Sequence, residues 1–157
     1  MAMASRISPV PEGRPALAAS IVAADAAAAI AFYVAAFGAV EAFRLTEPSG
    51  KIGHAELTLG GTVLMLSDPY PEYGAVPPGE GGRAVRLHLY VEDVDAAIAR
   101  AVAAGARVER PAADQFYGDR SGTIIDPAGH AWHLASRREE VSPAEMQARW
   151  DKMMMEG

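Results

Sequence analysis

The sequence consists of two similar halves whose matching residues lie 68 positions apart. Asp25 and Asp93 each stand at the start of an alanine-rich segment of about three helical turns. Residues 63–66 (Val-Leu-Met-Leu) fall on residues 131–134 (Ala-Trp-His-Leu) at the same offset, so the match extends beyond the alanines. A repeat of this kind restricts the chain to folds made of two copies of one supersecondary unit.

Each half contains the same series of local signals. A strand is followed by an Asp suited to cap a helix, then by the helix, and then by a Gly suited to end it. In the first half, Gly60-Gly61 separates two strand-like runs at 55–59 and 62–68, which is typical of a tight hairpin. The corresponding hairpin of the second half joins 122–126 to 130–136. The pattern predicts two βαβββ modules, an α+β fold that encloses a pocket for a small molecule.

The predicted organisation is one domain with two short extensions. Residues 1–14 form a flexible N-terminal arm, and residues 15–138 form the domain. Its modules cover about 15–68 and 84–138, joined by the Pro- and Gly-rich loop 69–83. Residues 139–157 form a C-terminal helical extension, because Ser142-Pro143-Ala144-Glu145 combines a capping box with Pro at the first helical position.

Composition excludes several classes of function. The chain has no cysteine, so disulfides, thiolate metal ligands and a cysteine nucleophile are excluded. The formal net charge is −6 and the basic residues are scattered, which argues against nucleic acid as a partner. No segment has the length and apolar character of a membrane span or signal peptide. We therefore expect a cytoplasmic protein with a small-molecule ligand.

The chain resembles the vicinal oxygen chelate superfamily of glyoxalases, bleomycin resistance proteins and dioxygenases, and within it the PhnB-like group. The resemblance covers roughly residues 15–138 and depends on segments 29–33 (Ala-Ile-Ala-Phe-Tyr), 37–39 (Phe-Gly-Ala), 88–95 (His-Leu-Tyr-Val-Glu-Asp-Val-Asp), 117–122 (Tyr-Gly-Asp-Arg-Ser-Gly) and 126–132 (Asp-Pro-Ala-Gly-His-Ala-Trp). It implies that the two modules form a cupped mixed sheet, the glyoxalase/bleomycin resistance fold, with a short C-terminal helix added. It also implies a homodimer.

The resemblance further implies where a metal ion would be bound. Metal-using members take ligands from four strand positions, which fall here on Ala18, Met65, Arg86 and His133. Only His133 offers a good donor for a divalent ion, since alanine has none, a thioether suits soft ions and a guanidinium repels cations. We therefore expect no metal cofactor at the usual site.

Alternation along the strands predicts which side chains face the cup. Four of these are competent ligands for zinc, nickel or iron, and form an alternative, rebuilt metal site: His54, Glu56, His88 and His133. As alternatives, His54 is a solvated strand-end residue and His88 a histidine hydrogen-bonded within the cup. Trp132 is predicted to pack in the core rather than to face a ligand.

The candidate ligand-binding residues include one cation. We expect Arg86 to bind an anionic group of the ligand, because its planar fork matches a carboxylate or phosphate. The alternative is an internal ion pair with Glu56. Arg120 is predicted to fix its loop by pairing with Asp119 or Asp126. The further candidate ligand-binding residues are His54, Met65, Tyr117 and His133.

Two functions follow from these residues. The first is a small-molecule binding protein that lacks the usual metal site. The alternative is a lyase, isomerase or dioxygenase, with the rebuilt metal site or with metal-free proton transfer by His88, Glu56 and Tyr90.

Overall fold

The computed structural model describes residues 7–79 and 84–157. Parts of the predicted N-terminal arm (1–6) and of the predicted inter-module loop (80–83) lie outside these residues. The first module comprises β1 (Ala19–Val22), α1 (Ala26–Phe37), β2 (Val40–Thr46), β3 (Ile52–Leu59) and β4 (Thr62–Ser67). The second comprises β5 (Arg86–Tyr90), α2 (Val94–Ala103), β6 (Arg107–Asp114), β7 (Asp119–Ile125) and β8 (Ala131–Arg137). A 3₁₀ turn at Pro71–Tyr73 follows the first module, and α3 (Pro143–Glu156) ends the chain.

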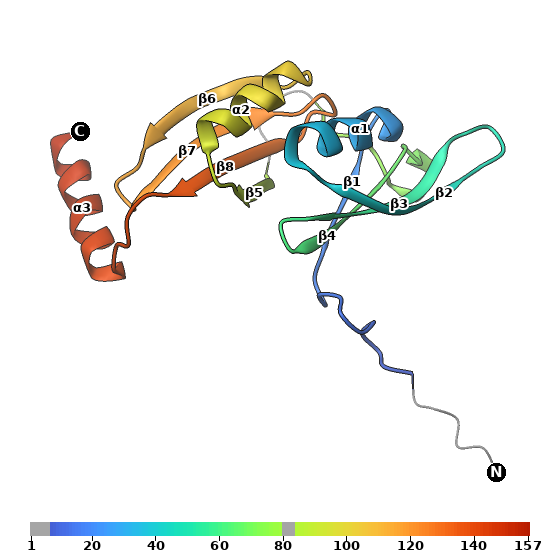
Figure 1. Ribbon diagram of the computed structural model, residues 1–157, viewed down its shortest axis with the longest axis horizontal. Helices are drawn as coiled ribbons and strands as arrows, with labels where there is room; N and C mark the ends of the chain where they lie inside the picture. Colours follow the sequence, from blue (N-terminus) through green and yellow to red (C-terminus); the bar gives the residue numbers. More distant parts are fainter. Residues whose placement is uncertain (1–6, 80–83) are drawn as a thin grey trace, which may run out of the picture.

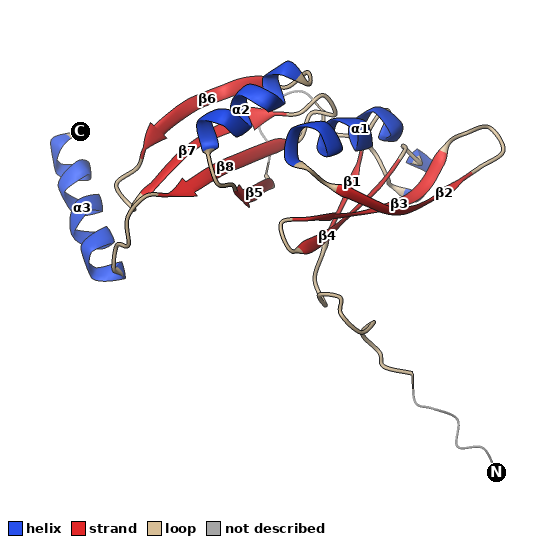
Figure 2. Cartoon of the chain, in the orientation of Figure 1, coloured by secondary structure: helices blue, strands red, loops and turns tan. Residues whose placement is uncertain are grey.

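Each module forms its own four-stranded mixed sheet, so the predicted α+β fold is confirmed (Figure 2). The strand orders are β1-β4-β3-β2 and β5-β8-β7-β6, with the first pair parallel and the others antiparallel. Ala19 pairs with Leu64, and Leu87 pairs with Trp132. These two pairs lie 68 positions apart, as the repeat predicts.

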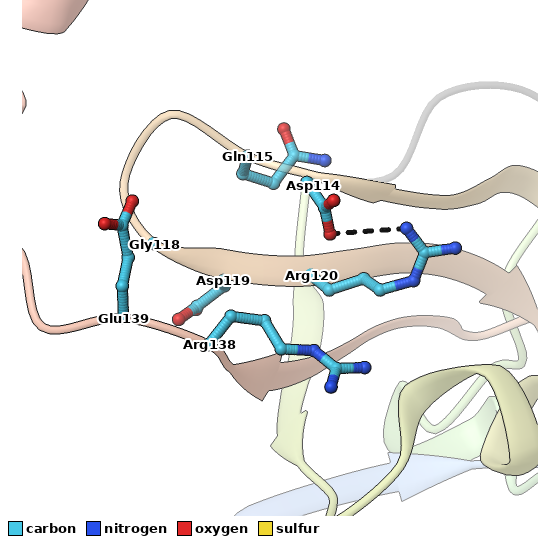
Figure 3. Close-up of a pocket in the computed structure, with 7 residues that line it drawn as sticks. All are labelled: Asp114, Gln115, Gly118, Asp119, Arg120, Arg138 and Glu139. Atoms are coloured by element: carbon cyan, nitrogen blue, oxygen red, sulfur yellow. Dashed lines mark hydrogen bonds and ion pairs between the residues drawn. The ribbon is translucent and has the colours of Figure 1, made fainter.

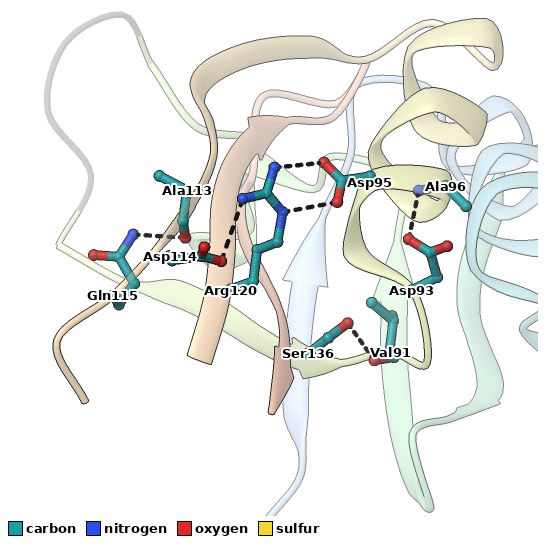
Figure 4. Close-up of polar contacts among 9 residues, drawn as sticks. All are labelled: Val91, Asp93, Asp95, Ala96, Ala113, Asp114, Gln115, Arg120 and Ser136. Carbon is teal, nitrogen blue, oxygen red and sulfur yellow. Dashed lines mark hydrogen bonds and ion pairs between the residues drawn. The ribbon is translucent and has the colours of Figure 1, made fainter. Parts of the chain in front are cut away.

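The helices begin where the repeat places their caps. Asp25 accepts a hydrogen bond from the Ala28 amide at 2.9 Å, and Asp93 accepts one from the Ala96 amide at 3.1 Å (Figure 4). Both caps satisfy an amide that would otherwise lack a partner in the first helical turn. The helix α1 ends at Gly38, whose φ of 69° lies in the left-handed region that glycine adopts freely.

Both helices lie on the same side of the two sheets (Figure 1). The strand residues that face them form the core, and Leu57, Leu66 and Leu134 are buried there. Trp132 is also buried, which confirms the prediction that it packs in the core. Apolar side chains are thereby removed from water on one face of each sheet, while the opposite face carries the polar candidates.

One buried carboxylate joins the two modules. Asp126, between β7 and β8, accepts hydrogen bonds from the Tyr33 hydroxyl of α1 at 2.6 Å and from Trp132 Nε1 at 2.8 Å. Burial raises the pKa of Tyr33, and the adjacent charge of Asp126 raises it further, so the phenol stays protonated as a donor. Phe37 packs against Trp132 with ring centroids 4.7 Å apart. The joint therefore combines aromatic packing with a satisfied buried charge.

The helix α3 projects beyond the second sheet and buries none of its side chains (Figure 1). Its predicted cap is confirmed, since Ser142 Oγ accepts from the Glu145 amide at 3.2 Å. Arg149 fastens the helix by donating to the Phe116 carbonyl at 2.9 Å and to Glu139 at 2.6 Å. In the described part of the chain, no helix has the length and apolar character needed to cross a bilayer.

Candidate functional site

The candidate residues lie on the sheet faces turned away from the helices, which we call the open faces. Alternation places Arg86, His88 and Tyr90 of β5 on the open face of the second sheet. His133 joins them because His88 and His133 are paired in the parallel register of β5 and β8. These four side chains therefore share one face of the second sheet, and the rings of His88, Tyr90 and His133 are in contact there.

Histidine and tyrosine rings form a continuous cluster on this open face. The ring centroids of His88 and His133 are 5.0 Å apart, and those of His88 and Tyr90 are 4.7 Å apart. His133 Nδ1 lies 3.2 Å from Thr123 Oγ1, which leaves Nε2 for a ligand. Burial lowers the pKa of His133, and the positive charges of His88, Arg86 and Arg110 lower it further.

Arg110 belongs to the same face, although it was not among the predicted site residues. It pairs with Thr123 across β6 and β7, and its charge acts on His133. The strand β6 has register shifts on both sides of Arg110, so simple alternation from the sequence does not place this side chain. Arg86 and Arg110 are exposed, and neither forms an ion pair with a carboxylate of residues 7–79 or 84–157.

The first sheet holds a separate pair of candidates on its open face. His54 Nε2 lies 3.0 Å from Glu56 Oε1, and Arg14 Nη2 donates to Glu56 Oε2 at 2.5 Å. The hydrogen bond from His54 holds the pKa of Glu56 below its usual value, and Arg14 adds to this effect. The alternative in which Glu56 pairs with Arg86 is wrong, because Arg14 of the N-terminal segment supplies the guanidinium.

Met65 is half-buried on the same open face, next to Glu56 in the register of β3 and β4. The predicted proton-transfer set is divided between the sheets, with His88 and Tyr90 adjacent on the second and Glu56 on the first. Its catalytic role stays a prediction.

A cavity of about 570 Å³ lies between Tyr90 of β5 and Met146 of α3. We call it the Asp119 cavity, and its lining residues are Tyr90, Tyr117, Asp119, Arg137, Val141 and Met146. The Tyr90 hydroxyl donates to Asp119 Oδ2 at 2.8 Å. Tyr117, a predicted ligand-binding residue, has its hydroxyl 3.3 Å from Ser121 Oγ. The position of Asp119 on a buried strand gave no signal of its own in the sequence.

Arg120 lies on the other side of β7, toward the helix α2. Its guanidinium donates to Asp95 at 2.8 and 3.0 Å and to Asp114 at 3.3 Å (Figure 4). The predicted pairing with Asp119 or Asp126 is therefore wrong, although the predicted structural role stands. The reason is alternation, since Asp119 points to the open face while Arg120 points away from it. Arg120 lines a second, charged pocket of about 540 Å³ together with Asp119, Arg138 and Glu139, so Asp119 borders both pockets (Figure 3).

The four positions that the resemblance assigns to metal ligands do not offer a set of donors for a divalent ion. Ala18 has no donor, Met65 offers a thioether, and the guanidinium of Arg86 is itself a cation, which leaves His133. The alternative ligands fall into two pairs, His54 with Glu56 and His88 with His133, on different sheets. No group of three or more candidate ligands that could hold a metal ion occurs in the described part of the chain.

Comparisons with known proteins agree with the fold. A sequence profile of the Glyoxalase/Bleomycin resistance protein/Dioxygenase superfamily matches residues 16–134. An uncharacterized protein of Mycobacterium tuberculosis (strain ATCC 25618 / H37Rv) is 46% identical over 138 residues, which are 85% of this chain and 81% of that protein.

Two solved structures are also similar. TioX from Micromonospora sp. ML1 has 28% sequence identity and a TM-score of 0.61, over 77% of this chain and 97% of TioX. The PhnB protein from Bacillus cereus is 18% identical with a TM-score of 0.60, over 78% of this chain and 99% of that protein, a likeness of fold alone.

Proposed function

The chain belongs to the glyoxalase/bleomycin resistance protein/dioxygenase superfamily, and on that premise we propose that it binds a small anionic molecule without a metal ion. The ligand's carboxylate or phosphate is bound by Arg86 on the open face of the second sheet. His88, His133 and Arg110 surround that position and complete an anion-binding surface.

Basic groups are concentrated on the open face of the second sheet, although the protein as a whole is acidic. Two arginines and two imidazoles share one sheet face, whereas the whole chain has a net charge of −6. Burial lowers the pKa of His133, and repulsion between its protonated form and the neighbouring charges of His88, Arg86 and Arg110 lowers it further. An anion relieves the repulsion and accepts charge-assisted hydrogen bonds from the guanidinium groups. A binding role explains why the two arginines have no carboxylate partner among the described residues.

Metal-independence is supported by the chemistry of the side chains. A guanidinium at one of the family's ligand positions repels a divalent cation and attracts the anionic group of an organic ligand. We therefore assign Arg86 the place in ligand binding that a metal ion holds in metal-using relatives.

A homodimer is part of the proposal. Exposed apolar side chains on β2 of the first sheet include Val40 (63% exposed), Phe43 (43%) and Leu45 (59%). A second copy that covers this face removes the apolar surface from water and encloses the ligand. In an isologous dimer each chain covers the apolar face of the other, so both faces are removed from water.

Titration with 2-naphthoate tests the anion-binding role of Arg86. Its ring gives a fluorescence signal, and 2-naphthyl phosphate and neutral 2-naphthamide provide matched comparisons. We expect both anions to bind and the amide to bind at least about tenfold more weakly, because a hydrogen bond to a charged group contributes about 1.5–3 kcal/mol. Arg86→Met removes the guanidinium at an exposed position and is expected to weaken 2-naphthoate binding by the same factor.

Arg100→Met is the control, because it removes an exposed arginine from α2, on the opposite side of the sheet. It should leave binding of 2-naphthoate unchanged. Equal binding of the amide and the carboxylate, or equal affinity of the Arg86→Met variant and the parent chain, would remove Arg86 from the site.

A further inference from the structure

We infer that Asp119 is a specificity-determining residue that binds a hydroxyl group of the ligand in the Asp119 cavity. This inference deepens the proposed function by adding a second, chemically distinct contact on the same open face. Arg86 and Tyr90 lie four positions apart along β5, which corresponds to roughly 13 Å at the rise of a strand. A ligand therefore reaches both positions only if its anionic group and its hydroxyl lie at opposite ends.

The carboxylate of Asp119 is buried but only half used. The residue is 6% exposed, and its Oδ2 accepts the Tyr90 hydroxyl. Among the described residues, none donates a hydrogen bond to Oδ1, and no fully buried side-chain oxygen lacks a partner. Oδ1 therefore reaches solvent, and Asp119 lines both the Asp119 cavity and the charged pocket beside Arg120. Alternation along β7 places the Asp119 side chain on the open face with Tyr90, in the wall of the cavity.

A ligand that fills the cavity and keeps solvent from Oδ1 must itself donate to this oxygen, because an unmet hydrogen bond of a charged group costs more free energy than that of a neutral one. Ligand groups that can donate include a hydroxyl and an ammonium. Arg137 lines the same cavity, and the one ion pair that it forms within residues 7–79 and 84–157, with Glu140, is long at 3.8 Å. A cation beside Arg137 would be repelled, whereas a hydroxyl donates to Asp119 and accepts from the guanidinium. The cavity thus favours a hydroxyl.

The remaining walls of the cavity favour an apolar carrier for that hydroxyl. Val141 is buried, and Met146 and Tyr117 are half-buried beside it. A methionine side chain adapts its shape to a ligand, and a tyrosine ring packs on flat apolar groups. The helix α3 supplies Met146, so it forms part of the cavity wall. The ligand class is therefore an aromatic or alicyclic alcohol.

The test uses 2-naphthol, which has an apolar ring and one hydroxyl but no negative charge. Titration of the ¹⁵N-labelled full chain, followed by amide chemical shifts, locates the bound probe. We expect shifts at residues 117–121 and in the first turn of α3. Two further probes keep the naphthalene ring and replace the hydroxyl. 2-Methoxynaphthalene cannot donate a hydrogen bond, and 2-naphthylmethylammonium carries a positive charge. Both are expected to bind about tenfold or more weakly, the loss expected for a hydrogen bond to a charged acceptor.

Variants test whether the carboxylate of Asp119, rather than a neighbouring group, binds the hydroxyl. Asp119→Asn should weaken 2-naphthol binding about tenfold. Asp114→Asn is a matched control, because Asp114 is exposed and pairs with Arg120 on the other side of the sheet. If Asp119→Asn fails to fold, the comparison of the three probes on the parent chain still decides.

Equal binding of 2-methoxynaphthalene, tighter binding of the ammonium probe, or shifts elsewhere than the Asp119 cavity would overturn the inference. Arg86→Met should leave 2-naphthol binding unchanged, because the probe has no anionic group. A failure of the proposed anion site is therefore distinguishable from a failure of the hydroxyl site.

Discussion

Asp126 shows how one residue can couple two modules. Its carboxylate accepts from Tyr33 in the first module and from Trp132 in the second, and its other oxygen accepts from the amides of Ala128 and His130. A buried charge is stable only when its hydrogen bonds are made, so these partners act together. The sequence showed Asp126 in a recognisable segment but did not indicate that Tyr33, 93 positions earlier, would be its partner.

Tyr33→Phe tests this coupling. The change removes one hydrogen bond to a buried charge and keeps the ring packing, so we expect the free energy of unfolding to fall by about 1.5–3 kcal/mol. Urea denaturation measures the loss. Tyr73→Phe, at a position 84% exposed, is the control and should change little. An unchanged unfolding midpoint for Tyr33→Phe would show that Asp126 is satisfied without the phenol.

A second test at the residue scale concerns Gly122, where β7 passes close to other backbone. A Cβ atom there would lie 2.8 Å from Ile98 Cδ1 and 2.9 Å from the Arg110 carbonyl oxygen. We expect Gly122→Ala to cost about 1–3 kcal/mol of stability through overpacking. Gly79→Ala meets no atom within 4 Å and serves as the reference in thermal unfolding. Equal Tm values for the two variants would contradict the close approach.

The sequence predicted which way the strand side chains face only where the strand alternates regularly. The strands β3 and β4 alternate without interruption across a two-residue turn, and the facing of Glu56 and Met65 is as predicted. The register shifts in β6 interrupt alternation, and so Arg110 was missed. Arg120 was placed in a structural role but with the wrong partners, because its ion pairs with Asp95 and Asp114 depend on how α2 and β6 pack around β7.

The attachment of the helix α3 to the domain can be tested through Arg149. Arg149 donates to Glu139, Glu145 and the Phe116 carbonyl, while the helix itself buries no side chain. We expect Arg149→Ala to speed amide hydrogen exchange across residues 143–156 without shifting the unfolding transition of the domain. Lys152→Ala, exposed on the same helix, is the control. Unchanged exchange in the Arg149→Ala variant would mean that other contacts hold α3.

At the scale of the whole molecule, the duplicated sequence predicted two modules but not how they are joined. The joint consists of side chains from both halves, such as Phe37 and Trp132, whose contact no local pattern specifies. The same applies to the site, where His88 and His133 meet through β5 and β8 while His54 and Glu56 remain on the other sheet. Strand parity predicted the faces, and the packing of the sheets decided which residues are neighbours.

The proposed homodimer gives a prediction at this scale. Light scattering coupled to size-exclusion chromatography should give about twice the 16.5 kDa mass of the chain. Phe43→Asp places a charge on the exposed apolar face of the first sheet and should shift the protein toward the monomer, because burying an unpaired charge is costly. Val102→Asp, at an exposed position of α2, is the control. A parent chain that runs as a monomer at every concentration would contradict the pairing.

We propose that Arg86 and its basic neighbours bind an anion at the place where metal-using relatives hold an ion. Calorimetric titration of 2-naphthoate into protein dialysed against a chelator, with and without added zinc, nickel or ferrous ions, tests it most directly. We predict the same Kd in the chelator and in each metal, and binding at least about tenfold weaker in Arg86→Met. Binding that appears only when a stoichiometric metal ion is restored would show that the site needs a metal ion and that Arg86 does not replace it.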